Sequence, residues 1–184
     1  PDGIKYFLTV GSIEPRKNQR LLLEVITLLR NQGHSDIKLI VVGSEGWDNK
    51  DLLKEFDLHH EMGSLIHLSM VSPSELCILY QNAIATVCPS ISEGFDYPGI
   101  EAIKSGGFVA ASDIPVHREI YGDAALYFDP YNAQDIAQCL KSFLTDESQV
   151  IKNQARLIAQ NTKIQFEDEY LSQQWEKLLY QASI

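Results

Sequence analysis

Short apolar runs alternate with helix-like segments along most of this chain, and this alternation restricts the fold more than any other feature. The apolar runs lie at residues 4–10, 37–42, 65–68, 84–88, 108–111 and 124–128. Helical patterns lie between and after them, at about residues 18–33, 47–60, 73–81, 98–105, 115–121 and 133–144. Strands that alternate with helices pair in parallel, with helices on both faces. The sequence therefore predicts an α/β fold with a doubly wound parallel sheet of about six strands.

Polar and small residues mark the ends of several predicted helices. Asn18 is expected to cap the first helix, Pro98 suits the first turn of another, and the pair Gly106-Gly107 suits its end. From residue 147 onward the composition is helical and lacks strand signals. We expect a helical tail at about residues 147–184, broken near residues 161–162.

Composition and charge exclude several classes of protein. With 45% apolar and 22% charged residues among 184, the chain is long enough for one sizeable core and is unlike a disordered segment. A net charge of −10 argues against nucleic acid as a partner, and no membrane-spanning stretch is visible. The three cysteines, Cys77, Cys88 and Cys139, are predicted to be buried, reduced thiols.

Two carboxylates stand where a parallel sheet builds a ligand site. The segment 88–107 reads C-P-S-I-S-E-G-F-D-Y-P-G-I-E-A-I-K-S-G-G, with Glu93 in a loop after a strand and Glu101 in the predicted first turn of a helix. Both can face a crevice into which unpaired backbone N–H groups also point. Hydroxyl groups and phosphates are the expected guests.

A pair of cations forms the second chemical feature. Arg16 and Lys17 follow the first strand and precede a helix, where positive charge opposes the helix dipole unless an anion bridges the two side chains. A diphosphate is such an anion, because Arg offers two donors and Lys a mobile charge. The alternative is a solvated pair in a polar turn.

The frame P-S-x-x-E-G-F-x-x-P-x-x-E-A-x-x-x-G around Glu93 and Glu101 resembles the E-x7-E signature of retaining GT-B glycosyltransferases of family 4. The likeness continues at residues 11–18 and 122–130 and covers about residues 4–145. It implies that residues 1–184 are the C-terminal, nucleotide-sugar-binding domain of a GT-B enzyme, one Rossmann-like half of the fold. The chain starts without Met, so we expect an excised domain whose N-terminal acceptor domain is absent.

The resemblance also implies a role for individual residues. Arg16 and Lys17 would stabilise the leaving diphosphate, Glu93 would contact hydroxyls of the transferred sugar, and Glu101 would bind the ribose hydroxyls. Backbone N–H groups of Gly94, Phe95, Gly99 and Ile100 would contact sugar or phosphate, while Gly43 and Val71 would flank the nucleobase. The structural alternatives are an exposed loop residue for Glu93, dipole stabilisation for Glu101 and ordinary turn chemistry for Gly43.

One residue departs from the family pattern. Asp96 occupies a place where the family usually has Gly. If that position has a positive φ, Asp is among the less costly replacements. A negative charge beside a donor diphosphate would be unfavourable unless the carboxylate points away.

The expected activity is retaining transfer of a hexose from a nucleoside-diphosphate sugar to a sugar or lipid-linked acceptor, in surface polysaccharide biosynthesis. The turn at residues 13–18 resembles bacterial mannosyltransferases, so GDP-mannose is the first expected donor and a UDP-sugar the second. No cofactor or metal is expected, since the chain has no Asp-x-Asp triplet and no metal-ligand spacing among its histidines.

Several expectations concern the whole enzyme and its alternatives. We expect a cytoplasmic protein, or one peripheral at the cytoplasmic face of the membrane, whose isolated donor domain is inactive. Rival interpretations are a GT-B sugar-nucleotide epimerase or phosphorylase domain, and a non-catalytic nucleotide-sugar-binding module.

Overall fold

The computed structural model of the chain describes residues 3–145, and the helical tail predicted at 147–184 lies outside the described residues. Within residues 3–145, six strands form one parallel sheet in the order β3-β2-β1-β4-β5-β6. The strands are β1 (Tyr6–Val10), β2 (Lys38–Val42), β3 (Leu65–Leu68), β4 (Thr86–Cys88), β5 (Val109–Ser112) and β6 (Ala125–Phe128). The predicted α/β, Rossmann-like fold is therefore confirmed.

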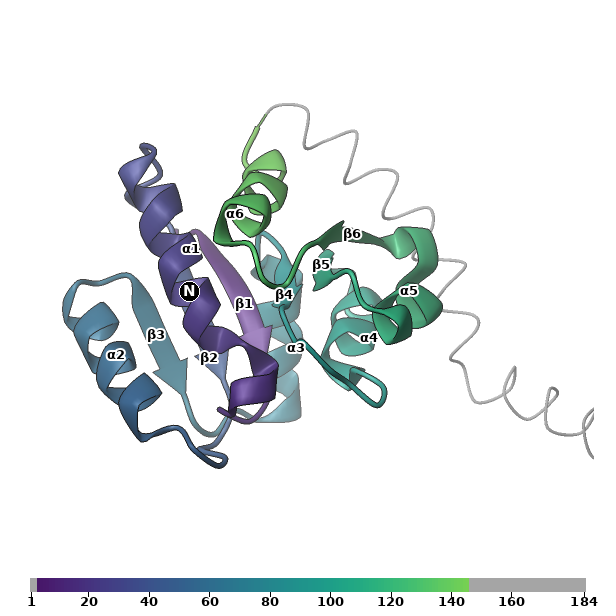
Figure 1. Cartoon of the computed structure of the whole chain (residues 1–184), viewed down its shortest axis with the longest axis horizontal. Helices are drawn as coiled ribbons and strands as arrows, with labels where there is room; N and C mark the ends of the chain where they lie inside the picture. Colours follow the sequence, from purple (N-terminus) through teal and green to yellow (C-terminus); the bar gives the residue numbers. More distant parts are fainter. Residues whose placement is uncertain (1–2, 146–184) are drawn as a thin grey trace, which may run out of the picture.

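Helices cover both faces of this sheet (Figure 1). They are α1 (Gln19–Asn31), α2 (Lys50–Glu61), α3 (Pro73–Asn82), α4 (Tyr97–Lys104), α5 (Pro115–Tyr121) and α6 (Ala133–Ser142), with short 3₁₀ helices η1 (Pro15–Lys17) and η2 (Gly122–Ala124). Buried side chains of α1, α2 and α6 share one apolar cluster, and those of α3, α4 and α5 share the other. The sheet is doubly wound, with a core on each side.

The winding direction changes at the centre of the sheet. β1 pairs with β2 on one side and with β4 on the other, although β4 comes much later in the chain. Loops that leave the carboxyl ends of two such strands diverge and leave room for a ligand between them. The loops after β1 and β4 are the segments that carry the predicted cations and carboxylates.

The strand predictions hold to within two residues at each end, whereas two side-chain predictions were wrong. Asn18 does stand just before α1, with a left-handed backbone (φ of 57°), but its side chain makes no hydrogen bond to the helix. Its Nδ2 donates instead to the carbonyls of Pro89 (3.1 Å) and Pro130 (2.8 Å). It ties three loops together instead of capping a helix. Of the three cysteines, Cys88 is buried, but Cys77 and Cys139 are only half-buried. Cys139 packs at the margin of the apolar cluster that α6 shares with α1 and α2.

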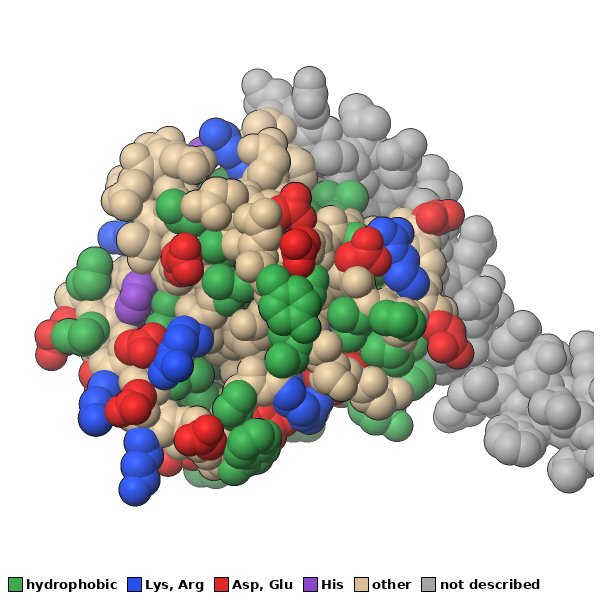
Figure 2. Space-filling view, viewed as in Figure 1, with side chains coloured by type: hydrophobic (Ala, Val, Ile, Leu, Met, Phe, Trp, Pro, Cys, Tyr) green, Lys and Arg blue, Asp and Glu red, His purple; other side chains and the backbone are tan. Residues whose placement is uncertain are grey.

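The surface carries mixed charge. On the face shown in Figure 2, basic and acidic side chains alternate and no continuous basic patch is visible. No helix in the described part of the chain combines the length and apolar character that crossing a bilayer requires.

Helix α3 begins with a capping box. The amide N of Glu75 donates to Oγ of Ser72 (3.3 Å), and the amide N of Ser72 donates to Oε2 of Glu75 (2.9 Å). We expect Ser72→Ala to lower the free energy of unfolding by about 1 kcal/mol, because one helix N–H loses its acceptor. Urea denaturation measures this, with the exposed Ser35→Ala as the control. An equal effect of both substitutions would show that the cap contributes nothing.

Candidate functional site

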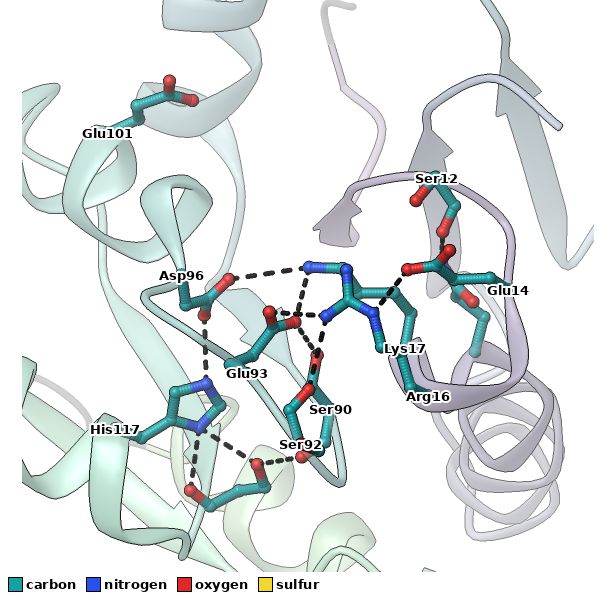
Figure 3. A network of polar contacts seen from close by, with 12 residues as sticks. Ser12, Glu14, Arg16, Lys17, Ser90, Ser92, Glu93, Asp96, Glu101 and His117 are labelled. Atoms are coloured by element: carbon teal, nitrogen blue, oxygen red, sulfur yellow. Dashed lines mark hydrogen bonds and ion pairs between the residues drawn. The ribbon is translucent and has the colours of Figure 1, made fainter. Parts of the chain in front are cut away.

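The predicted cations and one predicted carboxylate meet at the carboxyl edge of the sheet (Figure 3). Nζ of Lys17 lies 2.6 Å from Oε1 of Glu93, and Nη1 of Arg16 lies 2.6 Å from Oε2 of the same carboxylate. Both cations come from η1, after β1, while Glu93 comes from the loop after β4. Residues more than seventy positions apart in the sequence therefore form one ion-pair cluster.

Further contacts hold this cluster in place. Nε of Arg16 pairs with Oε1 of Glu14 at 2.7 Å, and Ser90 donates its hydroxyl to Oε1 of Glu93 at 2.7 Å. The backbone joins the same two loops, since the amide of Ile91 donates to the carbonyl of Arg16 at 3.0 Å. The side chains of Glu93 and Lys17 are only 6% and 11% exposed. Several contacts fix the cluster, and its Glu93 and Lys17 side chains are mostly shielded from water, whereas Arg16 is partly exposed.

The Glu93 carboxylate is held in its ionised form. Burial opposes ionisation, but hydrogen bonds from the two cations and from Ser90 outweigh it, so the pKa of Glu93 lies below its ordinary value. Arg16, Lys17 and Ser90 bind the two carboxylate oxygens of Glu93, and the same donors could bind the oxygen atoms of a phosphate or a sugar hydroxyl. The site is therefore electrically balanced and can exchange one set of hydrogen bonds for another.

Glu101 lies apart from this cluster. α4 begins at Tyr97, so Glu101 stands in the second turn and not in the predicted first turn. It is exposed, and Tyr80 of α3 donates its hydroxyl to Oε2 of Glu101 at 2.9 Å. In Figure 3 the Glu101 carboxylate points away from Glu93. Its distance from the helix start removes the dipole-stabilising interpretation, because that effect fades beyond the first turn.

The residues expected to offer backbone N–H groups divide into two pairs. Gly94 is exposed and Phe95 half-buried in the loop, while Gly99 and Ile100 are buried at the start of α4. No side chain caps the first turn of α4, because Asp96 at the N-cap position makes no capping bond. A Cβ on Gly99 would overlap the hydroxyl of Tyr121. Only glycine lets this helix start approach α5 so closely.

The residues expected near the nucleobase lie in the segments after β2 and β3. Val71 lines a mostly apolar groove of about 290 Å³, together with Leu68, Met70, Glu75, Ile78 and Leu79. Gly43 directly follows β2, and a Cβ there would overlap the carbonyl oxygen of Gly11, so packing alone requires glycine at this position. The base contacts of Gly43 and Val71 stay predictions.

Asp96 adopts the left-handed backbone that the sequence suggested, with φ of 111°. Its carboxylate is buried and points into the protein: Tyr121 donates its hydroxyl to Oδ2 at 2.6 Å, and Nε2 of His117 lies 3.2 Å from the same oxygen. Nζ of Lys17 lies 4.0 Å from Oδ1. Sequence reasoning missed His117 and Tyr121, because no local pattern marks a buried partner on a distant element. It also assigned no role to Glu14, which pairs with Arg16 two residues further on.

Comparisons with known proteins agree on one family. The family model described as glycosyl transferases group 1 matches residues 1–164. The chain is 33% identical over 163 residues to O-antigen chain mannosyltransferase B of Escherichia coli. The aligned region covers 89% of this chain and 43% of that protein. It is 34% identical over 139 residues to O-antigen chain mannosyltransferase RfbU of Salmonella typhimurium, and this alignment covers 74% of this chain and 38% of RfbU. The chain thus spans less than half the length of these curated relatives.

Solved structures match in fold. The sucrose-phosphate synthase of Thermosynechococcus elongatus superposes with a TM-score of 0.76 at 22% identity, over 99% of this chain and 46% of the other. The catalytic domain of cholesterol-alpha-glucosyltransferase from Helicobacter pylori superposes with a TM-score of 0.70 at 21% identity, over 86% of this chain and 97% of the other.

Proposed function

This chain belongs to the glycosyl transferases group 1 family, and from that premise we propose that residues 1–184 are the donor-binding, C-terminal domain of a retaining hexosyltransferase. The domain would bind a nucleoside-diphosphate sugar between the loops after β1 and β4. A second domain, beyond the part of its relatives that this chain spans, would present a sugar or lipid-linked acceptor. This division into two domains is supported by the mannosyltransferase relatives, because the chain aligns with only 43% and 38% of their lengths.

The observation that carries the proposal is the bridging of Arg16 and Lys17 by the Glu93 carboxylate, at 2.6 Å from each. A diphosphate has more acceptor oxygens than a carboxylate and would take over both cations, which frees Glu93 to accept from the hydroxyls of the donor sugar. During transfer, the bond between the anomeric carbon and the diphosphate oxygen breaks, and negative charge grows on the leaving group. Two cations already in place would stabilise that charge.

The donor is proposed to be GDP-mannose, with a UDP-sugar second. Two of the relatives are named O-antigen chain mannosyltransferases, which supports a mannosyl donor and a role in surface polysaccharide biosynthesis. No cofactor is proposed. The full-length enzyme would act in the cytoplasm or at the cytoplasmic face of the membrane.

Thermal-shift measurements test the proposal. A ligand that binds only the folded chain raises the Tm, so GDP, UDP, ADP and their sugars can be ranked directly. We expect GDP and GDP-mannose to give the largest shifts. If none of the six ligands changes the Tm, the donor-domain proposal fails.

A product assay on the full-length enzyme separates the rival enzymes. A transferase releases a nucleoside diphosphate, a phosphorylase releases a sugar phosphate, and an epimerase changes the sugar without transfer to an acceptor. Binding with none of these products would favour a non-catalytic module.

The role of Glu101 gives a separate prediction. Glu101→Gln should weaken GDP binding by about 1 kcal/mol, because an amide keeps the shape of the side chain but accepts at one end only. Binding of 2′,3′-dideoxy GDP should hardly change, since it lacks the hydroxyls. Calorimetry measures both affinities, with the exposed Glu119→Gln on α5 as the control. Equal losses for the two nucleotides would assign Glu101 a structural role.

A further inference from the structure

The buried imidazole of His117 has its two nitrogens in different surroundings. Nδ1 lies 3.0 Å from the carbonyl oxygen of Ser112 and 3.0 Å from the hydroxyl of the same residue. That hydroxyl donates its own hydrogen to the carbonyl of Ser90 at 2.5 Å, so toward Nδ1 it can only accept. Both neighbours of Nδ1 are acceptors, and Nδ1 therefore carries a proton.

The other nitrogen faces a carboxylate. Nε2 of His117 lies 3.2 Å from Oδ2 of Asp96, within ion-pair distance, and makes no hydrogen bond to any other group in residues 3–145 or to that oxygen. Burial opposes ionisation of Asp96, but its polar contacts with His117, Tyr121 and Cys88 outweigh it, so the pKa of Asp96 lies below its ordinary value. Nε2 of His117 therefore faces a buried carboxylate.

Neighbouring titratable groups add no further charge to this pair. Burial raises the pKa of the Cys88 thiol on β4, of the Tyr121 hydroxyl on α5 and of the Tyr127 hydroxyl on β6, the last to about 12. All three are neutral near pH 7. On its own helix, Arg118 is exposed and bound by both carboxylate oxygens of Asp113, at 2.7 and 2.8 Å. The Lys17 ammonium lies 4.0 Å from Oδ1 of Asp96.

We propose that Asp96 and His117 form a buried ion pair that positions Lys17 for the donor diphosphate. This inference rests on the proposed function. Without a donor, Lys17 is held by Glu93 at 2.6 Å and by Asp96 at 4.0 Å. When Glu93 turns to the sugar hydroxyls, Asp96 is the carboxylate that still holds the ammonium group. His117 supplies the positive charge that keeps Asp96 from repelling the phosphates.

The substitution Asp96→Asn tests this role, because two explanations predict opposite signs. If Asp96 positions Lys17, calorimetry should show about tenfold weaker GDP binding, which is 1.4 kcal/mol, and guanosine binding changed by less than about twofold. If the carboxylate only repels phosphate, its loss should tighten GDP binding. The control is Asp113→Asn, which removes an exposed carboxylate of the loop after β5 and should change neither affinity. Tighter or unchanged GDP binding by Asp96→Asn would overturn the proposal.

A ligand-free measurement separates this inference from the donor proposal. In the nitrogen-15-labelled chain, both ring nitrogens of His117 should carry protons, and the Lys17 ammonium should give a slowly exchanging signal that is lost in Asp96→Asn. A neutral His117 ring, or a Lys17 signal that Asp96→Asn leaves unchanged, would overturn the positioning role. If the wild-type chain binds none of the six nucleotides and nucleotide sugars, the donor-domain proposal fails, and these spectra alone decide the role of Asp96.

Discussion

Residues 1–184 on their own are expected to bind a nucleoside-diphosphate sugar without transferring the sugar to an acceptor. The described residues form a sheet with a core on each face, which is sufficient for a folded binding domain. Transfer also needs an acceptor held against the anomeric carbon, and such positioning accounts for roughly 7–11 kcal/mol of a barrier. The chain spans 43% of its mannosyltransferase B relative, so the acceptor side is proposed to lie outside it.

This expectation is measured by following nucleotide-sugar binding and product formation with the same protein. The 184-residue chain should show a ligand-induced rise in Tm and no sugar transfer above the uncatalysed rate. The chain joined to an N-terminal domain should transfer sugar in the presence of a chelator, because no Asp-x-Asp triplet is available to hold a metal-bound diphosphate. Rapid transfer by residues 1–184 alone, or a strict need for magnesium or manganese in the longer protein, would refute the assigned architecture.

Removal of either cation should weaken diphosphate binding far more than nucleoside binding. Hydrogen bonds to charged groups contribute about 1.5–3 kcal/mol, so Lys17→Ala should reduce GDP affinity by roughly 10- to 150-fold. Arg16→Ala should have the smaller effect, because its side chain is 42% exposed against 11% for Lys17. Glu93 keeps its bond from Ser90 in either variant, so the loop should stay folded.

Calorimetry with GDP and guanosine measures the difference, with two exposed cations as controls. Arg20→Ala and Lys54→Ala each remove an exposed cation that pairs with a carboxylate, Glu55 or Asp51, away from the cluster. These controls should bind GDP like the wild type. A loss of the same size for GDP and guanosine in Lys17→Ala would show that Lys17 does not contact the phosphates.

Local sequence pattern was sufficient for most of the fold. Short apolar runs predicted all six described strands because a strand covered on both faces needs apolar residues at nearly every position. The predicted starts of α3, α5 and α6 coincide with the structure, whereas that of α4 was one residue late. α4 begins at Tyr97, one residue before Pro98, because the left-handed backbone of Asp96 stops the preceding loop there. That shift moved Glu101 out of the first turn.

The cations and Glu93 were recognisable from sequence as chemically suited groups, since their motifs are contiguous. The cations and Glu93 come into contact because β4 pairs with β1 in the sheet. This pairing brings together loops more than seventy residues apart in the sequence.

The sequence by itself determined the fold class, the family and the side chains with suitable chemistry, because these depend on residue type and spacing along the chain. Only the tertiary structure decided that Asp96 faces His117 and that Asn18 holds three loops in place of capping a helix. A buried charge is stable only beside a specific partner. That partner is chosen by packing between distant elements, which leaves no periodic trace in the sequence.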